Sequence, residues 1–97
     1  MQPVRVRLRL AGGTQYATWQ GAFEIVALTG TLSQDGSHLH LAVADDQGRT
    51  VGSHLTEGCT VRTTAEVVLG ADDRLVFARE HDPAIGYDEL VVRQRDP

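Results

Sequence analysis

Residues 38–55, which read HLHLAVADDQGRTVGSHL, decide the fold that we expect for this chain. In the first seven of them, His or Ala alternates with Leu or Val, the period of two that marks a β-strand with one apolar face. Residues 45–48 then read DDQG, and a three-residue loop with Gly48 at positive φ is a favoured hairpin connection. The sequence therefore predicts a hairpin in which residues 37–44 pair with residues 50–55.

The register of this hairpin brings three histidines together. His38 and His40 are two residues apart in one strand, so they share a face. If Asp45 lies opposite Arg49, His40 faces His54, and directly opposed Cβ atoms are about 4.5–5.5 Å apart. Three neutral imidazoles are a known ligand set for zinc. Two alternatives stay open: a two-residue loop would turn His54 to the other face, and the three side chains could be ordinary polar groups on a sheet.

Two carboxylates in apolar stretches are candidate catalytic groups. Glu24 stands between Phe23 and Ile25, and Glu66 lies in a stretch rich in Thr and Val. Burial there would raise their pKa and suit either for acid–base chemistry. The alternative is a structural role, with Arg62 able to pair with either one. Water, an anion or the Glu24 carboxylate would fill the fourth position of a zinc ion.

The rest of the chain has the rhythm of short strands between glycine turns. In the first strand, three arginines alternate with apolar residues, and they are interpreted as a solvated face or as ion pairs with another subunit. The other interpretation of Arg5, Arg7 and Arg9 is a contact with phosphate or an anionic ligand. Further strands are predicted over residues 4–10, 22–32, 59–69, 74–79 and 89–93, with loops over 11–20 and 80–87.

Composition bounds the class of protein. The chain has 97 residues, a net charge of −4 and one cysteine, which suits a single domain over residues 1–97 without a disulfide framework. We found no unbroken apolar stretch of membrane-spanning length or of the secretory-signal type, so a cytoplasmic protein without a membrane partner is expected. Because nucleic-acid binders usually carry a basic excess, the negative charge predicts weak DNA binding or none.

Several blocks of the sequence, in order, resemble the plant and prokaryote conserved (PPC) domain family. The resemblance covers residues 4–92. The blocks are GAFEI at 21–25, LTGTLS at 28–33, G-x-HLH at 36–40, GSHL at 52–55, GC at 58–59, TTAEVVL at 63–69 and GYDEL at 86–90.

This resemblance implies an α+β family with an antiparallel sheet and a homotrimeric assembly. It also implies that His38, His40 and His54 are the zinc ligands, because several prokaryotic members bind zinc through histidines at the matching positions. Plant members carry an AT-hook that binds AT-rich DNA, and this sequence has no such segment. The family's strand and helix ahead of residues 4–10 are absent here, so the chain is expected to be mainly β. Two further departures are Ser53, where the family has Gly, and Ile85, where it has Thr.

From the resemblance and the histidines together, we expect a zinc-binding homo-oligomeric module, with a small ligand or anion at the metal and a possible DNA-associated role by family. The alternative is a zinc-dependent enzyme acting on a small acid, because the family's fold is similar to that of acetolactate decarboxylase.

Overall fold

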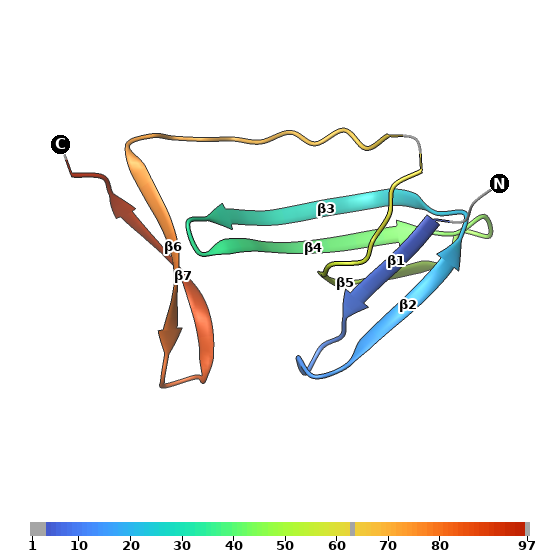
Figure 1. Ribbon diagram of the computed structural model, residues 1–97, viewed down its shortest axis with the longest axis horizontal. Helices are drawn as coiled ribbons and strands as arrows, with labels where there is room; N and C mark the ends of the chain where they lie inside the picture. Colours follow the sequence, from blue (N-terminus) through green and yellow to red (C-terminus); the bar gives the residue numbers. More distant parts are fainter. Residues whose placement is uncertain (1–3, 63, 97) are drawn as a thin grey trace. The chain divides into compact units, whose positions relative to one another are not determined.

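The computed structural model describes residues 4–62 and 64–96, and all the regular elements within them are β-strands. Five strands form one sheet in the order β2-β1-β5-β4-β3, and two more form the hairpin β6-β7 (Figure 1). The strands are β1 Val4–Arg9, β2 Tyr16–Gly21, β3 Glu24–Ser33, β4 Gly36–Ala44, β5 Thr50–Leu55, β6 Leu75–Asp82 and β7 Tyr87–Gln94. The expected mainly antiparallel β fold is thereby confirmed for these residues. None of them belongs to a helix long and apolar enough to cross a bilayer.

The chain divides into two compact units, which are described separately. The first contains the described residues through Gly30 together with His38–Glu66, and the second contains Thr31–Ser37 and the described residues from Val67 onward. In the second unit, the N–H of Gln34 donates to the Phe77 carbonyl oxygen at 3.2 Å, and the Asp35 carboxylate accepts the N–H of Arg79 at 2.8 Å. The histidines that the sequence singled out, His38, His40 and His54, all lie in the first unit.

The β4–β5 hairpin has the predicted turn. The N–H of Asp45 donates to the Arg49 carbonyl oxygen at 2.9 Å, and the N–H of Gly48 donates to the Asp45 carbonyl oxygen at 3.0 Å. Gly48 has the expected positive φ of 80°. The Asp45 carboxylate also accepts the N–H groups of Arg49 and Gln47, at 2.8 and 2.9 Å, and these bonds lower the pKa of its carboxyl group. Aspartate before the loop therefore fixes this turn through its own side chain.

One face of the sheet in the first unit forms the core. Its buried residues alternate along two strands, as a sheet with one apolar face requires. They are Val6 and Leu8 of β1 and Leu41 and Val43 of β4, with Val4, Trp19, Phe23, Leu28, Val51 and Leu55 packed against them. Since side chains alternate, the arginines between the buried β1 residues lie on the opposite face.

The loop predicted over residues 11–20 is wrong in its second half, which forms β2. Tyr16–Gly21 pairs with the whole of β1, from Arg9 opposite Tyr16 to Val4 opposite Gly21. The connection is short: Leu10 N–H donates to the Gln15 carbonyl oxygen at 2.8 Å. The Gly-Gly pair before β2 lies in the turn of a hairpin. The polar residues of β2 weaken the apolar–polar alternation by which a strand is predicted, so this strand was missed.

The strand predicted over residues 59–69 is also wrong. Thr60 makes an isolated bridge to Arg5, residues 64–70 have no regular structure, and Thr63 lies outside the described residues. Many β-branched residues give a segment strand propensity, but a strand forms only where a partner supplies hydrogen bonds.

The loop predicted over residues 80–87 is wrong in half of its residues: 80–82 and 87 belong to strands, and 83–86 form the turn. β6 continues to Asp82 and β7 starts at Tyr87, so the connection has only four residues. The N–H of Gly86 donates to the Asp82 carbonyl oxygen at 2.8 Å and closes this turn. The charged residues at the ends of these strands are typical of a loop sequence. They are also compatible with a two-stranded hairpin, because its side chains are exposed there.

Candidate metal centre

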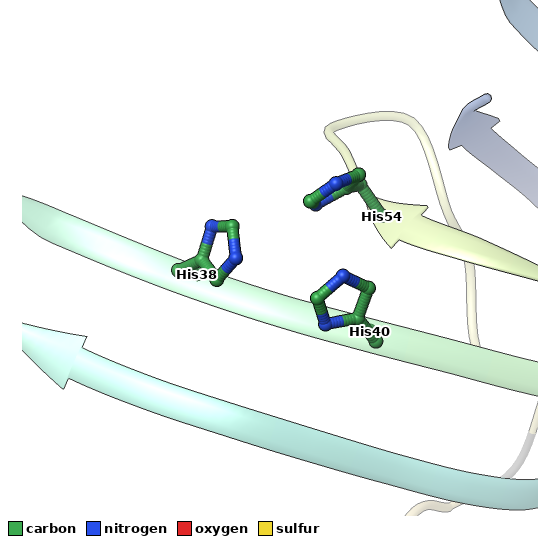
Figure 2. Close-up of side chains that lie close together, drawn as sticks. All are labelled: His38, His40 and His54. Atoms are coloured by element: carbon green, nitrogen blue, oxygen red, sulfur yellow. The ribbon is translucent and has the colours of Figure 1, made fainter. Parts of the chain in front are cut away.

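The three histidines converge on one side of the β4–β5 pair (Figure 2). β4 supplies His38 and His40, and β5 supplies His54, which lies directly opposite His40. One ring nitrogen from each residue lies within 4.8 Å of the other two. The ring centroids of His40 and His54 are 4.3 Å apart, and the His38 centroid lies 5.2 Å from that of His40 and 5.0 Å from that of His54. The predicted register is confirmed, and the open alternative with His54 on the other face is excluded.

The donor set fits a zinc ion. Zn–N bonds of about 2.0–2.1 Å in tetrahedral geometry would place ligand nitrogens about 3.3 Å apart, and the three nitrogens here lie within 4.8 Å of one another without an ion. Among the described residues, no carboxylate or thiolate belongs to this group. Three imidazoles without a fourth protein ligand leave one coordination position for another molecule.

The surroundings of His54 favour its neutral form. Burial, followed by the positive charge of Arg9 and the neighbouring rings of His40 and His38, lowers the pKa of His54 below its usual value of 6.5. A metal ion binds the neutral imidazole, so the lowered pKa extends the pH range in which this ligand is ready.

Gly30 of β3 allows the close strand contact behind the cluster. A Cβ atom at Gly30 would come within 2.1 Å of the His38 carbonyl oxygen and 2.8 Å of the Leu39 Cα. The φ of Gly30 is 152°, a backbone conformation that residues other than glycine rarely adopt. Glycine is therefore required here for β3 to approach β4 beside the first histidine.

Ser53 joins β1 to β5 next to the cluster. Its hydroxyl donates to the Arg9 carbonyl oxygen, at the point where Arg9 lies opposite His54 and Leu8 lies opposite Leu55. The departure from glycine at position 53 thus adds a hydrogen bond that fixes β1 beside a histidine of the cluster.

The two candidate carboxylates do not join the cluster. Glu24 is exposed and opens β3, six residues before Gly30, a separation of about 20 Å along a strand. Glu66 is exposed in the irregular segment. Neither forms an ion pair with Arg62 within the residues that the structure describes. Within one chain, Glu24 is thus not brought to the cluster as a fourth ligand.

Two other polar residues are placed by the structure. The fourth histidine, His81, is exposed in β6, with its Nδ1 3.5 Å from the Asp88 carboxylate. Arg9 lies opposite His54, a juxtaposition that sequence reasoning missed. The period of two in residues 4–10 had placed the arginines on one face, but the pairing of β1 with β5 cannot be read from either strand alone.

The fold and the cluster define a small antiparallel β-protein with a candidate metal centre. A family model described as the Plants and Prokaryotes Conserved (PCC) domain matches residues 4–72, and the chain belongs to this family. The resemblance noted in the sequence is therefore confirmed.

Relatives include one solved structure and two curated proteins. A hypothetical protein from Salmonella cholerae-suis (Salmonella enterica) is 45% identical with a TM-score of 0.90, over 97% of this chain and 68% of that one. "Bifunctional protein GlmU" of Synechococcus sp. (strain JA-3-3Ab) is 52% identical over 87 residues, and its namesake in strain JA-2-3B'a(2-13) is 49% identical over 86 residues. These regions cover 90% and 89% of this chain but only 14% of each relative.

Proposed function

We propose that this chain is a metal-binding module that holds one zinc ion through His38, His40 and His54. The observation that carries the proposal is the convergence of three imidazole nitrogens, from two paired strands, within 4.8 Å. The ion would connect β4 to β5 and add its binding free energy to the stability of a small sheet. Its remaining coordination position would take water or a small anion.

The module is also proposed to assemble as a homo-oligomer, with a trimer expected from the family resemblance. Few side chains are buried, whereas many large apolar ones are exposed. Among them, Val26 is 61% exposed, Leu69 70% and Val68 98%. Exposed apolar side chains of this kind support an interface with further copies.

The comparisons support a module that can form one part of a larger protein. The two GlmU relatives contain a similar segment as a small part of a much longer chain, so this kind of domain also occurs joined to others. The net charge of −4 supports weak direct DNA binding or none.

The direct test is the zinc content of the purified protein at neutral pH. We expect about one zinc per chain after addition of zinc and removal of the excess. His40→Ala should reduce this by at least tenfold, because His40 lies between its strand neighbour His38 and its cross-strand partner His54.

His81→Ala is the matched control, since it removes a histidine outside the cluster and should leave zinc content unchanged. Less than about one-tenth of an equivalent in the unmodified protein, or equal zinc loss in both variants, would contradict the proposed site.

A further inference from the structure

We infer that the sheet face around the histidine cluster binds a small carboxylate, with one end at the metal ion and the other at the Arg9 guanidinium. This inference rests on the proposed metal site and names its ligand class. The ligand would have two carboxylates, or a carboxylate and a second oxygen donor.

The first observation is a row of residues across three strands. Arg9 of β1 lies opposite His54 of β5, and His54 lies opposite His40 of β4. Directly opposed residues share a face and have Cβ atoms about 4.5–5.5 Å apart. A flexible arginine side chain is therefore based one strand away from a metal ligand, on the same face.

The second observation is the charge of this face. On β1 and β2 its residues are Arg5 with Gln20, Arg7 with Thr18, and Arg9 with Tyr16. On β4 and β5 they include His40 with His54 and Ala42 with Gly52, followed by Ala44 with Thr50. Within these four strands the face carries arginines and histidines and no carboxylate, although the whole chain has a net charge of −4. Such a segregated positive face attracts anions.

The third observation is the state of Arg9 itself. Its side chain is half-buried and forms no ion pair or side-chain hydrogen bond within the residues that the structure describes. Arg7, by contrast, lies over the Tyr16 ring at 4.2 Å. The Arg9 Nη1 lies 3.2 Å from the position of a Cβ at Gly13, so the guanidinium lies beside this glycine and a side chain there would crowd it. An arginine fork without an acidic partner is suited to a carboxylate.

A small anion fits these observations better than a nucleic acid. Nucleic-acid affinity needs many phosphate contacts across a basic surface, whereas here one arginine is based one strand away from a ligand of the proposed metal ion.

The test uses calorimetry on the zinc-loaded protein with two probes, succinate and acetate. Succinate can reach both the metal and Arg9, whereas acetate can reach only one of them. We expect Arg9→Gln to weaken succinate binding by about tenfold or more, the size of a lost charge-assisted interaction, and to abolish the preference for succinate over acetate. Arg5→Gln is the matched control, because Arg5 lies on the same strand face but four residues from Arg9; it should change the affinity by less than about twofold.

The outcomes separate this inference from the proposed function. If the unmodified protein takes up no zinc, the proposed metal site fails, and this inference fails with it. If zinc binds but Arg9→Gln leaves succinate affinity unchanged, or Arg5→Gln weakens it equally, only the inference is overturned. Should Arg9→Gln fail to fold, Arg9→Lys keeps the charge and loses the fork, and succinate must still bind several-fold more weakly for the inference to stand.

Discussion

At the residue scale, Gly30 is the position where substitution should harm the fold most. A methyl group there would overlap the His38 carbonyl oxygen, and the backbone would be strained at a φ of 152°. We expect Gly30→Ala to lower the free energy of unfolding by at least about 2 kcal/mol, measured by denaturant titration.

Gly36→Ala is the matched control for this prediction. Gly36 also has a positive φ, 113°, but an added Cβ would contact nothing within 4 Å. It should therefore show the backbone strain without the overlap and destabilise the protein less. Equal losses in the two variants would contradict the close-approach argument.

His54 should make the metal-free protein sensitive to acid. Because its pKa is lowered in the folded state, the folded chain binds fewer protons than the unfolded chain just below pH 6.5. Stability is therefore expected to fall as the pH drops below about 6.5. His54→Gln should flatten this dependence in thermal melts from pH 7.5 to 5, and His81→Gln should leave it in place. If the melting temperature of His54→Gln depends on pH as strongly as that of the unmodified protein, the assignment to His54 is contradicted.

At the element scale, the junction of β1 with β5 depends on a side chain. The Ser53 hydroxyl donates to the Arg9 carbonyl oxygen, so Ser53→Ala should reduce the free energy of unfolding by about 1 kcal/mol. Hydrogen exchange should also accelerate in β1. Ser37→Ala, at an exposed position of β4, should change the free energy of unfolding by less than about 0.5 kcal/mol. If it destabilises the protein as much as Ser53→Ala does, the role assigned to the Ser53 hydrogen bond is contradicted.

The elements also show what sequence reasoning can and cannot reach. The β4–β5 hairpin was predictable with its register, because Asp45 and Gly48 fix a short turn locally. The segment 59–69 was not, since its β-branched residues indicate propensity but not whether a partner strand exists. The same limit explains the candidate site. The histidines share one hairpin, whereas the distance of Glu24 and the proximity of Arg9 depend on how other strands are ordered.

At the scale of the whole molecule, the exposed apolar residues predict assembly. Light scattering at micromolar concentration should give a multiple of 10.5 kDa, three-fold for the expected trimer. Val68→Glu should shift the mass toward one chain, because Val68 is 98% exposed in the single chain and is free to lie in an interface. Gln47→Glu, in an exposed turn, should leave the mass unchanged. A monomer in the unmodified protein would contradict the proposed assembly.

The confinement of the histidines to one hairpin has a consequence for the order of folding. From His38 to His54 the ligands span 17 residues, so bringing them together closes only a short loop, with a small entropic penalty and fast formation. A nascent chain would present all three imidazoles as soon as this hairpin left the ribosome, before β6 and β7 had emerged from it. We therefore expect an ion captured at that stage to hold β4 against β5 before the β6–β7 hairpin forms its own, separate sheet.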